Sequence, residues 1–234
     1  MTRGFKTVYN LNVFKTTPTP KSETTRKLVL KTALRLFRRW GFDDTTMRDI
    51  ATEAALSLGA AYYYFPTKEA IVVAYYDQVQ TEHERATQAE LAMTMDLRAR
   101  IRMAFHAKLD IIAKDRALLG ALFRHVGNPK DALSVFGPQT KPLRDESIAT
   151  FAAALGDPHL PADMRTVAPA LLWFIHMGLI FYMLYDDSKD LRRTRALADA
   201  AADLFVGLLT LARLPGFGAL RRRALNALRE AEVF

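Results

Sequence analysis

The chain has 234 residues, of which 50% are hydrophobic, and it carries a net charge of +8 with a pI near 9.8. This apolar content suffices for one large domain or two small ones. The sequence contains no cysteine, which excludes disulfides and thiolate metal sites and favours a cytoplasmic location. The positive charge favours anionic partners, nucleic acid first.

The first 21 residues are polar and basic and end in "TTPTPKS", which predicts an arm without stable structure. Such an arm could contact DNA. From Ser22 onward the pattern is helical, with Ser22 as the expected N-cap and Gly41 as the expected end of the first helix. Its apolar stripe recurs at three- and four-residue spacing and comprises Leu28, Val29, Thr32, Ala33, Leu36 and Phe37.

Two short helices follow. Thr45 or Thr46 is expected to cap a helix that runs to about Ala54, and Ser57 a helix that runs to about Tyr64. Pro66 ends the second of them, and Thr67 caps a longer helix that runs to about Gln88. Two short helices joined by a tight turn and braced by a third are typical of a helix-turn-helix, which binds DNA.

Three consecutive tyrosines, Tyr62, Tyr63 and Tyr64, stand at the end of this motif. Consecutive helical positions point in different directions, so at least one ring faces solvent or a partner. The alternative is that all three pack in a helical core.

The rest of the chain predicts further helices at about 96–114, 116–126, 139–155, 163–186, 190–213 and 218–231, and no strands. The fold class is therefore all-α, with a helix-turn-helix domain at 22–75, a larger helical domain at 76–214 and a basic amphipathic segment at 215–234. The segment "VAPALLWFIHMGLIFYMLY" is the most apolar run, but Pro169, His176 and Gly178 interrupt it. A buried core or interface helix is favoured over a membrane span.

The stretch "RKLVLKTALRLFRRWGFDDTTMRDIATEAALSLGAAYYYFPTKEAI" resembles the DNA-binding domain of the TetR family of transcriptional regulators. The resemblance implies that Thr46 and Arg48 contact the DNA backbone, and that Tyr62 and Tyr63 reach phosphates or bases. Lys68 would hold a phosphate together with the amide groups of its helix, while Tyr64 would pack at the domain edge. The residues implied to face the groove are Ser57, Leu58, Gly59 and Ala60. The domain core would comprise Ala33, Leu36, Phe37, Ile50, Ala51, Ala54 and Phe65.

Two positions depart from the family pattern. Ala55 stands where the turn usually carries glycine, and alanine there costs on the order of 1 kcal/mol if the backbone is left-handed. Ala61 stands where a bulkier apolar residue is common, so the third helix could pack more closely.

The resemblance further implies a ligand-binding and dimerising C-terminal domain, in which the helices near 163–186 and 190–213 form a hairpin that pairs with a second copy. The alternative for the apolar helix is the centre of a monomer. The implied protein is a homodimeric, ligand-released repressor that binds a palindromic operator and a largely apolar small ligand. The pocket candidates are Phe105, His106, Phe123, Arg124, His125, Trp173, Phe174, His176, Met177 and Tyr182.

Nothing in the sequence predicts a metal site, a cofactor or catalysis. No two histidines have the i, i+4 spacing of metal ligands, and no phosphate-binding or dinucleotide-binding glycine motif occurs. A helical enzyme is the remote alternative. A closer one is a DNA-binding regulator without a small ligand, controlled by a protein partner, whose C-terminal domain would be packed solid.

Overall fold

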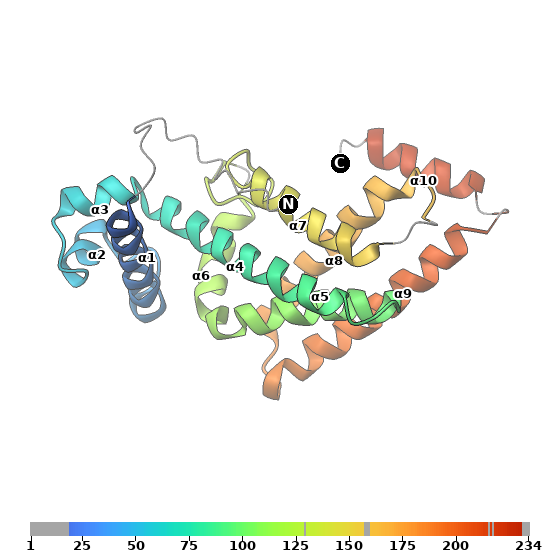
Figure 1. Ribbon diagram of the computed structural model, residues 1–234, viewed down its shortest axis with the longest axis horizontal. Helices are drawn as coiled ribbons and strands as arrows, with labels where there is room; N and C mark the ends of the chain where they lie inside the picture. Colours follow the sequence, from blue (N-terminus) through green and yellow to red (C-terminus); the bar gives the residue numbers. More distant parts are fainter. Residues whose placement is uncertain (1–18, 129, 157–159, 215, 217, 231–234) are drawn as a thin grey trace. The chain divides into compact units, whose positions relative to one another are not determined.

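The computed structural model describes residues 19–128, 130–156, 160–214, 216 and 218–230, and within these ranges the chain is helical with no strand (Figure 1). The all-α expectation is confirmed. Most of the expected N-terminal arm lies outside the described residues.

The DNA-binding motif begins with α1 (Pro20–Trp40). The helix starts earlier than expected, because the Thr19 hydroxyl, rather than Ser22, accepts the capping hydrogen bond, and Pro20 stands at the first helical position where its missing N–H costs nothing. Gly41 ends the helix with φ 92°, as predicted. Leu28 is exposed, whereas Leu30 and Leu34 are buried, so the apolar face is rotated from the expected stripe.

Three further helices complete the N-terminal pattern. They are α2 (Met47–Glu53), α3 (Leu58–Tyr64) and the long α4 (Lys68–Leu91). The expected small core is confirmed: all seven of its residues are at most 6% exposed, namely Ala33, Leu36, Phe37, Ile50, Ala51, Ala54 and Phe65.

The remaining helices follow the predicted order with small shifts at their ends. They are α5 (Leu97–Ile112), the 3₁₀ turn η1 (Ala113–Asp115), α6 (Arg116–Val126), α7 (Lys141–Leu155), α8 (Met164–Tyr185), the 3₁₀ turn η2 (Lys189–Leu191), α9 (Arg192–Ala212) and α10 (Gly218–Glu230). Between α8 and α9 the backbone of Asp190 and Leu191 is left-handed, with φ of 54° and 56°. The Asp186 carboxylate fixes this hinge, because it accepts hydrogen bonds from Ser188 and Thr194.

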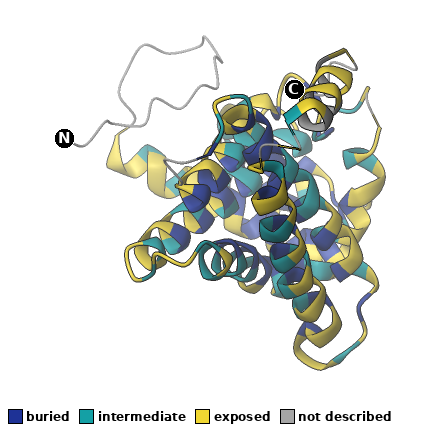
Figure 2. Cartoon of the chain, turned by 90° about the vertical axis from the view of Figure 1, so that its right-hand side faces the viewer, coloured by how far each residue is buried: buried dark blue, intermediate teal, exposed yellow. Residues whose placement is uncertain are grey.

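The chain divides into two compact units, which are not the two contiguous domains expected from the sequence. The first contains residues 1–75 together with 125–142, and the second contains 76–124 and 143–234. A segment between α6 and α7 therefore belongs to the same unit as the helix-turn-helix. In the second unit, buried residues line the inward faces of the helices and exposed residues the outward faces (Figure 2).

Helix α8 is long and apolar enough to cross a membrane, with a hydropathy of 1.9 over its most apolar window. Half of that window is buried inside the fold. Its buried side chains include Leu172, Trp173, His176 and Met183. Helix α8 therefore contributes to the core of the second unit, as predicted for a core or interface helix.

Candidate functional sites

The start of α2 is held by a capping box between Thr46 and Asp49. The Thr46 hydroxyl accepts a hydrogen bond from the Asp49 amide at 3.1 Å and donates to Asp49 Oδ2 at 2.6 Å, while the Thr46 amide donates to Oδ2 at 2.9 Å. The Thr46 hydroxyl thus donates its only hydrogen to Asp49, a partner within the protein. Arg48, next along the helix, is exposed.

The turn between α2 and α3 contains the left-handed residue that the sequence raised as a possibility. Ala55 has φ 54°, and the Leu56 amide closes the turn by donating to the Ala51 carbonyl at 2.9 Å. Ser57 then caps α3, because its Oγ accepts a hydrogen bond from the Ala60 amide at 3.1 Å.

Helix α3 has one buried side and one open side. Ala61 is fully buried and Phe65, just beyond the helix, is 2% exposed. Tyr62 and Tyr63 are 46% and 61% exposed, so the tyrosines do not all pack in the core. Tyr64 is half-buried and its ring meets that of Tyr63 edge-on at 5.0 Å between centroids.

Gly59 lies on the open side of α3. A Cβ at this position would meet no atom of the described protein within 4 Å, so internal packing does not require a glycine here. Leu58 and Ala60 are half-buried, and Ser57 is exposed. The exposed surface of α3 is therefore made of small side chains followed by two tyrosine rings.

Lys68, at the start of α4, has protein partners. Its Nζ donates to the carbonyl oxygens of Phe42 and Asp43 at 2.6 and 3.1 Å and lies 4.6 Å from the centre of the Phe42 ring. Burial lowers the pKa of this ammonium. In the structure Lys68 therefore binds the loop between α1 and α2. The resemblance implied a contact with a DNA phosphate instead.

His125 contacts the same loop rather than a pocket. Its ring meets Phe42 edge-on at 5.3 Å between centroids, Nδ1 is 2.7 Å from Asp131 and Nε2 is 3.5 Å from Asp43. All four residues belong to the first unit. His125 was expected in the ligand pocket, but in the structure it belongs to the first unit and packs against the loop between α1 and α2.

Two sequence families match the chain. The pattern described as "Bacterial regulatory proteins, tetR family" covers residues 29–75, and "Tetracyclin repressor-like, C-terminal domain" covers residues 100–220. The chain belongs to the TetR family. It is a TetR-family transcriptional regulator and not an enzyme.

This TetR-family regulator is similar to other proteins in sequence or in fold. The HTH-type transcriptional regulator YuxN of Bacillus subtilis (strain 168) is 44% identical over 59 residues, which are 24% of this chain and only 20% of YuxN. The TetR transcriptional regulator of Nitrosomonas europaea is 18% identical with a TM-score of 0.63, over 78% of this chain and 98% of that one. Thermus thermophilus FadR, solved in complex with lauroyl-CoA, is 23% identical with a TM-score of 0.56, over 79% and 93%.

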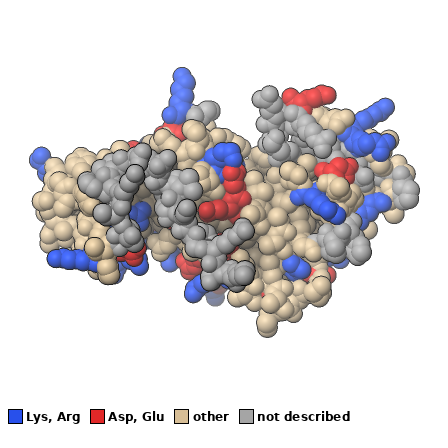
Figure 3. All heavy atoms as spheres, turned by 45° about the horizontal axis from the view of Figure 1, so that its top comes forward, with Lys and Arg blue, Asp and Glu red and all other residues tan. Residues whose placement is uncertain are grey.

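Charges of both signs lie on the face of the TetR-family regulator shown in Figure 3. Basic and acidic side chains are interspersed on the face shown in Figure 3, although the net charge of the whole sequence is +8. The net charge alone therefore does not locate the DNA-binding surface.

The structure separates the pocket candidates of the second unit into interior and surface residues. Phe105, Trp173 and His176 are at most 4% exposed, and Phe174 and Met177 are half-buried. Arg124 is exposed, as are Phe123 and Tyr182, at 37% and 39%. Phe123 packs on the surface against Phe181, with 4.6 Å between ring centroids. Residue type alone predicts these three side chains in a pocket, but their helices turn them outward.

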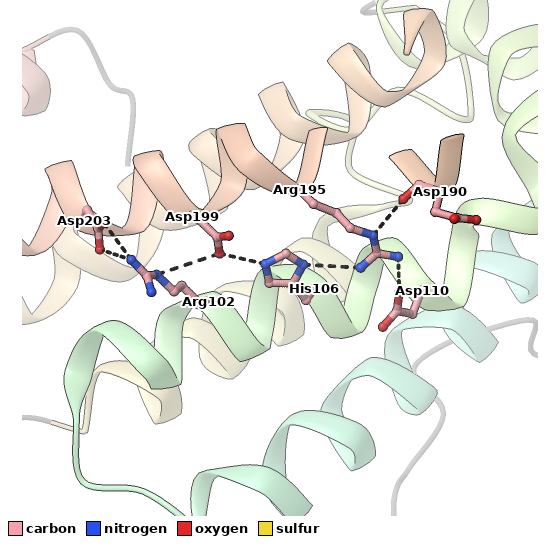
Figure 4. A network of polar contacts seen from close by, with 7 residues as sticks. All are labelled: Arg102, His106, Asp110, Asp190, Arg195, Asp199 and Asp203. Atoms are coloured by element: carbon pink, nitrogen blue, oxygen red, sulfur yellow. Dashed lines mark hydrogen bonds and ion pairs between the residues drawn. The ribbon is translucent and has the colours of Figure 1, made fainter. Parts of the chain in front are cut away.

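His106 belongs to a polar seam between α5 and α9 (Figure 4). The seam pairs Arg102 with Asp203 at 2.6 Å, His106 Nε2 with Asp199 at 2.8 Å, and Asp110 with Arg195. Residues four apart on one helix meet residues four apart, in reverse order, on the other, as antiparallel helices require. Arg195 also approaches His106 Nδ1 at 3.3 Å, so both ring nitrogens of His106 face this seam.

The interior of the second unit holds polar residues that the sequence reasoning missed. Gln80 and His83 on α4, Lys108 on α5 and Thr150 on α7 are buried together with His176 on α8. Lys108 Nζ donates to Gln80 Oε1 at 3.0 Å, and Gln80 Nε2 donates to the Thr150 hydroxyl at 3.0 Å. The signal was present, since Lys108 occupies a core position of the α5 stripe that contains Ile101, Ala104, Phe105, Leu109 and Ile112.

Proposed function

We propose that the chain is a cytoplasmic repressor that binds a palindromic operator as a homodimer and is released from DNA by a small ligand. The observation that carries the proposal is the open side of α3. Small side chains at Ser57, Gly59 and Ala60 permit close approach of the helix to the major groove, and the exposed Tyr62 and Tyr63 stand beside them.

The base-reading part of this interface is apolar. Leu58 and Ala60 offer no hydrogen bonds to base edges, so readout would rely on thymine methyl groups, backbone contacts and DNA shape. Arg48, exposed near the start of α2, is available for phosphate. Lys68 would act indirectly, by fixing the loop that precedes α2.

Homodimerisation is supported by the apolar surface of α8 and α9. Phe181, Tyr182 and Tyr185 on α8 are 41%, 39% and 68% exposed. On α9, Leu204, Leu208 and Leu211 are 65%, 55% and 46% exposed and recur at i, i+4 and i+7. A stripe of this kind on one helix face favours association. A second copy would cover it and place two reader helices about 34–36 Å apart, one turn of DNA.

A ligand is supported over the regulator without a small ligand by the interior of the second unit, where buried ring nitrogens of His83 and His176 have no hydrogen-bond partner. Thermus thermophilus FadR, which shares the fold, was solved with lauroyl-CoA, a ligand with a long apolar chain. In the proposed mechanism the ligand binds the DNA-incompetent state more tightly and so shifts the population away from DNA.

The proposal is tested by a salt-dependent anisotropy titration of the purified protein with DNA from upstream of its own gene and with a scrambled duplex. We expect selective binding with two protomers, or a multiple, per site, and a steep loss of affinity with salt. Equal affinity for both duplexes across the salt series would contradict specific binding to this DNA.

Tyr63 provides the matched point test. Tyr63→Phe keeps the ring but removes the hydroxyl, and we expect a roughly tenfold loss of affinity for specific and scrambled DNA alike, since a hydrogen bond to a charged group contributes about 1.5–3 kcal/mol at most. An unchanged affinity at moderate salt would remove Tyr63 from the phosphate contacts.

A further inference from the structure

Three helices, α4, α5 and α8, bring polar side chains to one place in the interior of the second unit, and we call Gln80, His83, Lys108 and His176 the buried polar cluster. None of these side chains is more than 5% exposed. The two histidine rings are stacked, with 5.9 Å between centroids and 9° between planes. Phe105 and Phe151 lie beside His176, at 6.5 and 5.3 Å between ring centroids.

Several hydrogen bonds of the cluster are unmade. His83 Nε2 lies 2.8 Å from the Ala104 carbonyl, which only accepts, so Nε2 carries the proton and Nδ1 has no partner. His176 has no partner on either ring nitrogen, although the residue is 2% exposed. Thr87 Oγ1, one turn along α4 from His83, is also buried without a partner.

Lys108 adds a buried cation. Its ammonium makes one hydrogen bond, to Gln80, and no ion pair joins it to a carboxylate of the described residues. Burial lowers its pKa to about 7. The pKa values of His83 and His176 are lowered first by burial and then by the charge of Lys108, so the three groups lie close enough to influence one another.

Such a cluster is costly for a purely structural purpose. A buried polar group without a partner destabilises the folded state, and buried charges are normally paired. Apolar side chains at these positions would pack without that cost. A bound group that accepts hydrogen bonds would complete those that Lys108 and His176 can still donate.

We propose that the buried polar cluster binds the ionised carboxylate of the regulator's ligand, whose apolar body lies against Phe105 and Phe151. This proposal rests on the proposed function, because it names the chemical class of the releasing ligand. Lys108 retains two N–H donors and His176 offers one, which matches the two oxygens of a carboxylate. The charge of Lys108 opposes a cationic ligand, and a phosphate dianion would be harder to bury.

The test compares carboxylates with neutral molecules of matched shape, on the full-length protein without DNA. The probes are octanoate against 1-octanol, dodecanoate against 1-dodecanol, and phenylacetate against phenylacetamide. We expect at least one carboxylate to bind about tenfold or more tightly than its neutral partner, by calorimetry and by the rise in Tm, because charge-assisted hydrogen bonds are the strong ones.

Two variants and one control assign the effect to the cluster. Lys108→Met should reduce the preference for the carboxylate to within about threefold, and His176→Phe, which keeps a ring beside Phe105, should weaken it in the same direction. Lys114→Met removes an exposed lysine shortly after α5 and should leave the preference unchanged. Proton uptake on binding at pH 8 gives a second readout, because a bound anion restores the charge on Lys108.

The proposal is overturned if no carboxylate binds the wild type more tightly than it binds Lys108→Met, or if each neutral partner binds equally well, which would leave the cluster with water only. These outcomes do not depend on DNA. If a carboxylate binds through Lys108 but leaves DNA affinity unchanged, ligand release fails while the binding site stands. If operator binding fails instead, the carboxylate result is unaffected.

Discussion

Two residues of the helix-turn-helix carry the wrong intrinsic preference for their positions. Ala55 adopts φ 54°, which favours glycine, whereas Gly59 stands inside a helix, where alanine is preferred. Position 55 thus has alanine although its left-handed backbone favours glycine, and position 59 has glycine although its helical backbone favours alanine. The first is a cost to stability, and the second makes sense if the space beside α3 is needed for DNA.

Ala55→Gly should stabilise the first unit. It relieves a left-handed strain of about 1–2 kcal/mol and loses about 0.4–1 kcal/mol through the freer unfolded chain, so we expect a net gain of roughly 0.5–1 kcal/mol. Urea unfolding checks this, with Ala60→Gly, at a regular helical position, as the control that should destabilise. A loss of stability in Ala55→Gly would mean that the turn does not hold this conformation.

Gly59→Leu should separate folding from DNA binding. The added side chain meets no described atom within 4 Å at its Cβ, and leucine is a better helix former than glycine, so Tm should be equal or higher. The same side chain would occupy the space where α3 approaches the groove, and we expect affinity for the operator to fall by about tenfold or more. Unchanged operator affinity would show that this side of α3 does not face DNA.

At the scale of helices, the ends and the buried faces were predictable to different degrees. Thr46, Ser57 and Gly41 set helix ends through contacts only a few residues away, so the sequence located Ser57 and Gly41 and left only Thr45 or Thr46 for the third. Which way α6 and α8 turn their aromatic side chains depends on packing across the unit. Phe123 and Tyr182 were therefore expected inside and lie outside. The spacing of the α5 stripe includes Lys108, but its partner Gln80 lies on α4, so only the packing of the helices brings the two together.

The contact between α4 and α8 predicts a pH dependence of stability. Burial lowers the pKa of His83 from 6.5 to about 3, so between these values the unfolded chain binds a proton that the folded chain excludes. The contribution of His83 to stability should therefore be full above pH 6.5 and be lost as the pH decreases from 6.5 toward 3, by at most about 1.4 kcal/mol per pH unit. Lys108, whose pKa is lowered from 10.5 to about 7, acts mainly at higher pH, between these two values.

Urea unfolding of the full-length protein at pH 7, 6 and 5, followed in the second unit, measures how the free energy of unfolding changes with pH. His83→Gln, whose amide can still donate to the Ala104 carbonyl, should flatten this dependence in part, with His176 supplying the remainder. An equal slope in wild type and variant would mean that folding does not lower the pKa of His83.

For the whole molecule, DNA binding and self-association should be linked. Replacing Leu204 and Leu208 by glutamate introduces like charges where two copies would meet, while both side chains are more than half exposed in one chain. We expect a folded monomer by sedimentation and a loss of operator affinity of about a hundredfold or more, since each half-site is then bound separately. A dimer of undiminished stability would place the interface elsewhere.

The return of residues 125–142 to the first unit has a consequence for modularity. Phe42 is 3% exposed, and His125 covers part of its ring from a segment some eighty positions later in the sequence. A fragment that stops at residue 75 would lack that cover and leave an aromatic ring in water. The helix-turn-helix segment is therefore incomplete without residues 125–142. A chimera that joins residues 19–75 to another effector domain should also include 125–142.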